Sequence, residues 1–369
     1  MIEGRFVRTH FEWLDILASK SAIVSRLDIK RSVSDEIYRA MGDKITSNID
    51  AFNLAGSESH NVAIAQTIEN LAKKGVSDGT LRKLVVDLTS RNTYGTFSEM
   101  SAYAFLLKGD HDFEVQVPVT GIDILNPNGA NLDGLLKLST DVLFDIKAFG
   151  FHGYLIRLIV DRLTADCAPE FVAAEESWDV PIPFLFNLLS AGYTGLRQEL
   201  KSKRFAQRGA VRFVLKSPAR VQVSAITLDP YRLAKVNADY AFRYAKQFAR
   251  SKPFFLFFVI HPWTGGGLLH VNFAGMVDKF TRAFARRTFM QFRDDQSVIF
   301  GVTKSEASEL LSGIVFVNAF EGENDHRGAR YRCFLNPFAK NKISSWSRRR
   351  LIEPYGYELM VDDFEDDAY

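Results

Sequence analysis

Two charged side chains interrupt an apolar run near the middle of the chain, which reads Val142-Leu143-Phe144-Asp145-Ile146-Lys147-Ala148-Phe149. A two-residue period predicts a strand in which Asp145 and Lys147 lie on the same face. At about 3.3 Å per residue, their α-carbons are roughly 7 Å apart, close enough for an anion and a cation to converge on one phosphate group. Packing alone gives so apolar a strand no reason to contain either charge.

Two earlier segments share the two-residue period, at residues 113–119 and 132–138. The turn-forming sequence Asn126-Pro127-Asn128-Gly129 separates them. Together with residues 142–149, these segments predict a small sheet.

Asp133 lies twelve positions before Asp145, on a segment that a turn could bring alongside the charged strand. The two carboxylates could then meet across adjacent strands. Two hard oxygen ligands facing a third polar group fit a Mg²⁺ site, because this ion keeps several waters and takes its other ligands from substrate phosphate. Glu99, near the start of a predicted helix over residues 97–107, could supply a third carboxylate.

This order of elements resembles the PD-(D/E)XK nuclease superfamily: a helix bearing Glu99, a strand, Asp133, then Asp145-Ile146-Lys147, then a helix and another strand. Leu132 stands where the family motif has proline. The resemblance implies an α-β-β-β-α-β core in which Asp133 and Asp145 hold Mg²⁺, or Mn²⁺ in its place, and Glu99 assists directly or through water. It also implies that Lys147 positions or activates the attacking water, and that the substrate is a phosphodiester of DNA rather than RNA.

The chain as a whole predicts an α/β protein with a restriction-endonuclease-like core, a mixed central sheet flanked by helices. Apolar spacings of three and four residues, as in residues 11–24 and 62–71, predict a helical N-terminal subdomain over residues 1–92. The nuclease-like core is expected over residues 93–265, with an inserted helical segment at about 152–208. A C-terminal α/β extension over residues 266–369 would carry a basic helix and an acidic tail.

Four further elements are predicted beyond the charged strand. A hairpin is expected from residues 211–215 and 220–227, and one long helix from residues 231–250. The apolar run over residues 253–260 is typical of a strand covered on both faces. Residues 314–318 predict another strand.

The acidic-any-lysine triplet is weak by itself, because Asp28-Ile29-Lys30 and Glu199-Leu200-Lys201 also satisfy it. Both of these copies lie in helical surroundings, where positions two apart point in different directions. Only the Asp145 triplet lies in an apolar strand with an aspartate upstream and a glutamate-bearing helix before that.

Each member of the candidate site also has a purely structural explanation. Thr96-Phe97-Ser98-Glu99 could be a capping box that only closes the start of a helix. Asp133-Gly134 could be a turn, and Asp145 with Lys147 could be an exposed ion pair on an edge strand. A purely structural interpretation of the site must therefore invoke such an explanation three times over.

A basic stripe is predicted on the helix near residues 278–293. Three-, four- and seven-residue steps place four cations on about one face, namely Lys279, Arg282, Arg286 and Arg293. Such a stripe could bind nucleic-acid phosphates, although a solvated charged face is the commoner explanation. The same two explanations apply to Lys201, Lys203, Arg204 and Arg208.

Composition is that of an ordinary globular protein, with 369 residues, 47% hydrophobic and 24% charged. The formal net charge of +2 does not by itself require a polyanionic partner. Cys167 and Cys333 lack the spacing of a zinc site or disulfide framework, which favours a reducing cytoplasm. No membrane span or signal pattern is predicted.

Restriction, defence and repair all fit the nuclease hypothesis, as would a homodimer or a partner subunit. The alternative is a catalytically silent nuclease-like module that binds nucleic acid or assembles with other chains.

Overall fold

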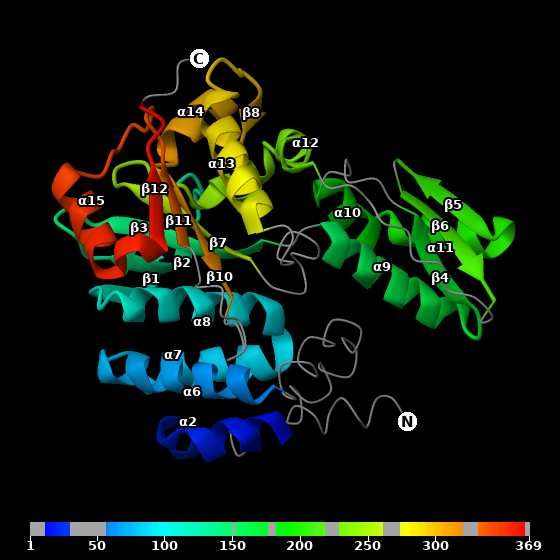
Figure 1. Ribbon diagram of the computed structural model, residues 1–369, viewed down its shortest axis with the longest axis horizontal. Helices are drawn as coiled ribbons and strands as arrows, with labels where there is room; N and C mark the ends of the chain where they lie inside the picture. Colours follow the sequence, from blue (N-terminus) through cyan, green and yellow to red (C-terminus); the bar gives the residue numbers. More distant parts are fainter. Residues whose placement is uncertain are drawn as a thin grey trace.

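The centre of the molecule is a mixed β-sheet covered by helices on both faces (Figure 1). The computed structural model describes residues 12–29, 57–149, 152–175, 182–209, 211–217, 229–260, 274–319 and 331–365. Within these residues the main sheet has seven strands in the order β1-β2-β3-β7-β10-β11-β12. The predicted α/β class, with a mixed central sheet flanked by helices, is therefore confirmed.

The sheet begins as an antiparallel meander and continues through parallel neighbours. β1, β2 and β3 pair antiparallel, β3 is parallel to β7 and β7 to β10, and β11 is antiparallel to β10 and parallel to β12. A parallel neighbour needs a crossover connection, so the chain leaves the sheet after β3 and returns at β7. The strand bounds are β1 (Phe113–Val119), β2 (Ala130–Leu136), β3 (Val142–Phe149), β7 (Phe254–Ile260), β10 (Gly313–Asn318), β11 (Tyr331–Leu335) and β12 (Leu359–Asp362).

β7 is buried along its whole length because it has a strand on each side and a packed layer on each face. Phe257 packs into the core on one side of the sheet and Phe258 into the core on the other. A strand covered on both faces needs apolar residues at every position, which explains the continuous apolar run of the sequence.

One face of the sheet is covered by α8, and further helices stack beneath it (Figure 1). Trp13 connects the N-terminal segment to the next helix of this layer, since its indole N–H donates a 2.6 Å hydrogen bond to the side chain of buried Asn61. The helix predicted over residues 11–24 is interrupted at Ser21, whose side chain accepts from Val24 N and caps a new helix. The helical bounds are α2 (Ala22–Arg26), α6 (Glu58–Lys73), α7 (Asp78–Val86), the π-helix η2 (Asp87–Arg91) and α8 (Thr93–Lys108).

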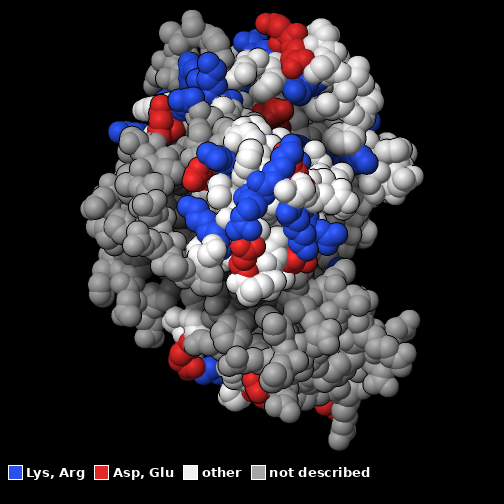
Figure 2. All heavy atoms as spheres, turned by 90° about the vertical axis from the view of Figure 1, so that its right-hand side faces the viewer, with Lys and Arg blue, Asp and Glu red and all other residues white. Residues whose placement is uncertain are grey.

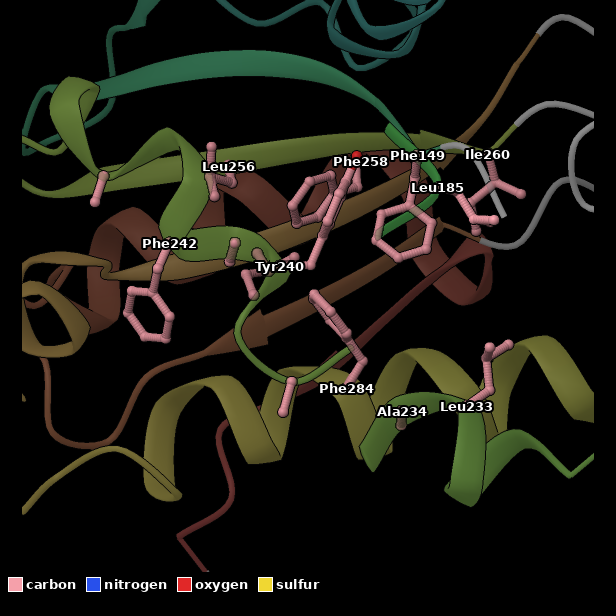
Figure 3. Close-up of a cluster of buried hydrophobic side chains, with 14 of the residues drawn as sticks. Phe149, Leu185, Leu233, Ala234, Tyr240, Phe242, Leu256, Phe258, Ile260 and Phe284 are labelled. Atoms are coloured by element: carbon pink, nitrogen blue, oxygen red, sulfur yellow. The ribbon is translucent and has the colours of Figure 1, made fainter. Parts of the chain in front are cut away.

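An aromatic cluster forms the core on the opposite face (Figure 3). The Phe149 ring centroid lies 5.0 Å from that of Phe258 and 5.4 Å from that of Phe284. These rings come from β3, β7 and α13, and Tyr240 of η3 packs edge-on against Phe149. The elements of this face are α12 (Pro230–Val236), the 3-10 helix η3 (Tyr240–Gln247), α13 (Ala274–Met290), β8 (Val298–Ile299), β9 (Val302–Thr303) and α14 (Lys304–Leu310).

The prediction of one long helix over residues 231–250 is wrong. α12 ends at Val236, and η3 begins at Tyr240 after a break. The Ala238 carbonyl accepts from the Thr288 hydroxyl of α13, and the side chain of buried Asn237 bonds back to Leu233 O. These side-chain bonds replace backbone bonds of a continuous helix.

A lobe lies to one side of the main sheet (Figure 1). The predicted helical insertion is only partly helical, because β4, β6 and β5 form a second sheet in that order. β6 pairs with β5 and β4, and the predicted hairpin partner at residues 220–227 lies outside the described residues. The lobe consists of α9 (His152–Cys167), β4 (Phe171–Glu175), α10 (Ile182–Leu189), α11 (Tyr193–Lys203), β5 (Phe205–Arg208) and β6 (Val211–Lys216).

The C-terminal residues contribute β10, β11 and β12 to the same sheet that contains β1, β2 and β3. α15 (Ser345–Ile352) and η6 (Glu353–Glu358) connect β11 to β12. The start of the acidic tail packs against basic side chains, since Asp362 pairs with Arg282 and Asp363 with Arg348. Among the helices of the described ranges, none has the length and apolar character needed to cross a membrane.

Candidate active site

The candidate site lies where β2 and β3 separate. Their pairing runs from Leu136 opposite Val142 to Gly134 opposite Phe144 and does not continue further. Beyond this point, Ile146 N donates a 2.6 Å hydrogen bond to Oδ2 of Asp133, the residue preceding Gly134. A carboxylate thus takes the place of a backbone partner, and we call this opening the fork.

Gly134 makes the close approach at the fork possible. A Cβ atom at this position would lie 2.2 Å from Cζ of Phe144 and 2.5 Å from the Glu114 carbonyl oxygen. Asp133-Gly134 belongs to β2, so the alternative of a simple turn is wrong. The glycine is required by packing and directly follows the acidic residue.

β1 is distorted opposite the fork. Gln116 has φ +56°, which is uncommon for a residue other than glycine. The pairing of β1 with β2 skips Gln116, although Val115 and Val117 are paired on either side of it. Val115 packs on the α8 side of the sheet and Val117 on the α13 side, although residues two apart in a regular strand point to the same face. The backbone of β1 therefore turns over at Gln116.

Asp145 and Lys147 lie on one face of β3, as the sequence predicts. They pair in register with Leu256 and Phe258 of β7, both of which belong to the core on the α13 side. Asp145 is 1% exposed and forms an ion pair with Lys147. The alternative of an exposed pair on an edge strand is wrong, because β3 lies between β2 and β7.

Helix α8 brings Glu99 near the fork. Tyr103 lies one turn after Glu99, and its hydroxyl donates a 2.9 Å hydrogen bond to the Asp133 carbonyl. The capping-box alternative for Glu99 is wrong, because α8 begins at Thr93 and its N-cap is Asn92. Glu99 is therefore an interior helix residue, close enough to Asp133 and Lys147 to interact with both electrostatically.

The charges of the site perturb each other strongly. Partial burial and the charge of Asp133 raise the pKa of Glu99 to about 8. Burial and the same neighbour raise the pKa of Asp145. Burial alone would lower the pKa of Lys147, but the carboxylates of Asp145 and Asp133 outweigh it and raise that pKa. The site therefore favours proton retention when no other cation is present.

The donor set fits a magnesium ion bound mainly by two aspartates. Oδ2 of Asp145 is buried and in direct contact with the ammonium group of Lys147. In the described ranges, no three His, Cys, Asp or Glu side chains are grouped closely enough to hold a metal ion. Mg²⁺ commonly takes only one or two carboxylates and keeps several waters. Glu99 would then act through a water molecule.

Two residues of the site were not predicted from the sequence. Nε2 of Gln116 lies 3.4 Å from Oδ1 of Asp133, and Oε1 of Gln116 accepts from Lys83 Nζ at 3.3 Å. Lys147 Nζ lies 5.4 Å from the ring centroid of Tyr244 in η3, a cation-π contact. A polar residue within the apolar segment Val115-Gln116-Val117 was the available signal for Gln116, whereas Tyr244 has none.

The competing triplets have no comparable setting. Asp28 lies in a turn after α2 with φ +46°, and Lys30 is outside the described residues. Glu199 is on helix α11 and pairs with Lys203 and Arg208. The preference for the Asp145 triplet agrees with these placements.

The predicted basic stripe is divided. Lys279, Arg282 and Arg286 lie on α13 and line a common groove. Arg293 follows the end of the helix, and its guanidinium stacks 3.7 Å from the ring centroid of Phe338. Including Arg293 in the stripe was wrong, because the helical period does not extend beyond Met290.

No protein-family model, curated protein or solved structure matches this chain. The geometry and chemistry of the fork, together with the residue pattern of Glu99, Asp133 and Asp145-Ile146-Lys147, therefore support the functional proposal.

Proposed function

We propose that this protein is a metal-dependent nuclease of the PD-(D/E)XK type that hydrolyses phosphodiester bonds in DNA. One observation carries the proposal: Asp133 and the Asp145–Lys147 ion pair meet at the fork, where the strands stop pairing. Two buried carboxylates beside one ammonium group leave excess negative charge that a divalent cation would offset.

Asp133 and Asp145 would hold Mg²⁺, with Mn²⁺ as a substitute, and Glu99 would contribute through water. A bound ion supplies Lewis acidity and lowers the pKa of its coordinated water. Asp133 is oriented for this role by Ile146 N on its carboxylate and by Tyr103 on its carbonyl. Such supporting hydrogen bonds hold a ligand in place and tune its basicity.

Lys147 acts in this proposal as a cation rather than as a base. Because neighbouring carboxylates raise the pKa of Lys147 despite its burial, the side chain stays an ammonium group at neutral pH. It can then position the attacking water or stabilise the negative charge that develops on the phosphate. Tyr244 packs against this ammonium group and limits its movement.

Glu99 suits a role in proton transfer. Its pKa of about 8 keeps it protonated in the cation-free site at neutral pH. Entry of a cation favours the carboxylate form and releases this proton. The deprotonated Oε atoms could then accept a proton from a water molecule at the fork.

DNA is the proposed substrate because of the resemblance in Glu99, Asp133 and Asp145-Ile146-Lys147. A restriction, defence or repair role is compatible with this chemistry. The restriction-endonuclease-like core is part of the same proposal. It is supported by the order of α8, the β1–β3 meander, α9 and the return to the sheet at β7.

A second candidate function is a nuclease-like module that binds nucleic acid without cleaving it. The observation in its favour is that Lys147 already neutralises Asp145, while no third carboxylate completes a compact ligand group within the described ranges. Incubation with plasmid DNA, linear DNA and RNA separates the two candidates, with Mg²⁺ or Mn²⁺ and with chelator. Cation-dependent cleavage supports the nuclease, and binding without cleavage under every condition supports the silent module.

A further inference from the structure

A basic groove lies near the other edge of the sheet from the fork, between helix α13 and strands β11 and β12. It has a volume of about 750 Å³. Five basic side chains of the described residues line it against two acidic ones, which gives it an excess of positive charge. The basic residues are Lys279, Arg282, Arg286, Arg287 and Arg332, and the acidic residues are Asp278 and Asp362.

The groove opens on the same face of the sheet as the fork. Lys147 is in register with Phe258, Phe258 with Phe316, and Phe316 with Arg332. Residues in register on neighbouring strands point to the same face. Lys147 and Arg332 are three strand spacings apart, roughly 14 Å at about 4.8 Å per spacing. Helix α13 packs over the row between them, since Phe284 contacts both Phe258 and Phe316.

The groove has a fixed basic floor. Arg332 is only 5% exposed and forms an ion pair with Asp278. Nε of Arg282 donates a 2.6 Å hydrogen bond to Asp362, which anchors this guanidinium to β12. These carboxylates orient both guanidinium groups, whose positive charge contributes to the floor of the groove.

The spacing of Lys279, Arg286 and Arg287 allows contact with more than one phosphate. Lys279 and Arg286 are seven residues apart on α13, which at 1.5 Å per residue is about 10 Å along the helix. This separation is longer than one phosphate group, so the two cations can contact different phosphates of one strand. Arg287 adds a further cation at the same end of the groove.

An exposed aromatic ring lies beside these cations. Tyr231 of α12 lines the groove and is 56% exposed, and Met360 of β12 opposite is 45% exposed. Rings next to a cationic track are stacking platforms for unpaired bases, which a base-paired duplex does not offer. The combination therefore favours a single strand over a duplex.

We propose that this groove binds a single-stranded segment of nucleic acid, with phosphates on Lys279, Arg286 and Arg287 and a base stacked on Tyr231. The inference rests on the proposed nuclease function for the identity of the strand, which would be an unpaired continuation of the substrate. The groove takes no part in bond cleavage. It holds the substrate about three strand spacings from the fork and determines a preference for substrates with single-stranded ends or flaps.

Binding of a fluorescent single-stranded oligothymidylate to the full chain tests this proposal. Anisotropy is measured in chelator, so that neither cleavage nor a bound cation is needed. The variant Lys279→Gln/Arg286→Gln/Arg287→Gln should bind at least tenfold more weakly than wild type. Because each phosphate contact on a single strand contributes about 0.7 to the salt slope, the slope should fall by about 2. Tyr231→Ala should weaken binding about fivefold or more, but should not affect an abasic strand.

The lobe provides a matched control. Figure 2 faces the side of the molecule where the lobe lies and shows Lys and Arg gathered with Asp and Glu beside them. Arg197 pairs with Asp166 and Lys203 with Glu199, as expected of a solvated charged face. Arg197→Gln/Lys201→Gln/Lys203→Gln removes the same number of charges and should leave strand affinity within about twofold of wild type.

The proposal would be overturned if the groove variant, with its fold intact by circular dichroism, bound the single strand as tightly as wild type. It would also be overturned if the lobe control weakened strand binding as much as the groove variant does. A third contradicting result is that the groove variant loses as much affinity for a fully paired duplex as for the single strand. The failure of the nuclease proposal would look different. Wild type would then cleave nothing in Mg²⁺, while the groove variants still lost strand binding and Asp145→Asn still bound normally.

Discussion

At the scale of single residues, Asp145 and Lys147 carry the proposed chemistry. Asp145→Asn and Lys147→Met each remove one charge at the fork while keeping a side chain of similar size. We expect each variant to lower Mg²⁺-dependent cleavage by about 100-fold or more, because the lost group acts on developing charge. The measurement is the single-turnover cleavage rate, with folding checked by thermal melting.

The triplet on α11 supplies the control for these variants. Glu199→Gln and Lys201→Gln change an acidic residue and a lysine at the same spacing on helix α11. Cleavage should stay near the wild-type rate. A larger effect on α11 than at the fork would show that the wrong triplet was chosen.

Glu99 makes the stability of the cation-free protein depend on pH. Its pKa is raised from 4.5 to about 8, so between these values the folded chain binds more protons than the unfolded chain. Stability from this group is fully present below pH 4.5 and is lost as the pH rises through about 8. Glu99→Gln should flatten this decline and raise the Tm at pH 9 by about 2 °C or more, since 1 kcal/mol shifts the Tm of a large domain by about 2–4 °C.

Melting curves in chelator between pH 5 and pH 9 provide this measurement. Glu58→Gln is a suitable control, because Glu58 is an exposed residue of α6 far from the fork in sequence. A pH profile that is the same in Glu99→Gln and wild type would contradict the assigned coupling of Glu99 to Asp133.

Gln116 combines an unusual backbone with a contact to Asp133. Gln116→Ala removes the hydrogen bond to Asp133 and the link to Lys83 and keeps a side chain at φ +56°. Gln116→Gly removes the same contacts but relieves the backbone. We expect both variants to lose about 10-fold in Mg²⁺ affinity, as for other residues that support a ligand. Only the alanine variant should also be destabilised.

The outcome separates two explanations of the strained backbone. Equal loss of Mg²⁺ affinity in both variants assigns Gln116 a positioning role through its side chain. Normal Mg²⁺ affinity in the glycine variant would show that the Gln116 side chain does not position Asp133 and that this residue only allows β1 to bend.

How far the site could be predicted differs between its residues for physical reasons. The pair Asp145–Lys147 follows from strand period alone, because the period fixes which side chains share a face. Gln116 and Tyr244 reach the fork through tertiary packing, from β1 and η3. No local pattern encodes such contacts.

At the scale of elements, the fork depends on how β2 and β3 separate. Residue patterns predicted both strands, but they contain no information on where pairing ends. The end follows from Asp133, whose carboxylate accepts the hydrogen bond from Ile146 N–H that continued pairing with β2 would have used. A similar tertiary bond, from Thr288 to Ala238 O, divides the segment predicted as one long helix.

Gly134 tests the close packing of the fork. In Gly134→Ala the new methyl group would meet Phe144 and a backbone oxygen of β1, and the backbone oxygen cannot simply rotate away. We expect a loss of about 1–3 kcal/mol in the free energy of unfolding, which is typical of overpacking, and a parallel loss of cleavage. Urea denaturation measures the first quantity.

Gly195→Ala on α11 is the matched control, because nothing lies within 4 Å of its added Cβ atom. Alanine in an open helical position should stabilise the chain by up to about 1 kcal/mol. Comparable stability of Gly134→Ala and wild type would mean that the fork is not tightly packed.

At the scale of the whole molecule, one sheet joins the fork near one edge to the basic groove near the other. The α/β class was predictable because the apolar run of β7 demands covering layers on both faces. The pairing of β10, β11 and β12 within this sheet was not predictable, because the sequence of a long crossover connection does not indicate which strands will pair. The groove consequently could not be predicted as a site, although three of its cations were.

The claim that the fork holds a catalytic divalent cation is tested most directly by calorimetric titration of Mg²⁺ or Mn²⁺ into the cation-free protein. We predict saturable binding that is lost in Asp133→Asn and Asp145→Asn. Protons should be released at pH 7 and fewer at pH 9, because the pKa of Glu99 is about 8 and that of Asp145 is raised. Absence of Mg²⁺ and Mn²⁺ binding, even with DNA present, would contradict the account and leave the fork as part of a non-catalytic module.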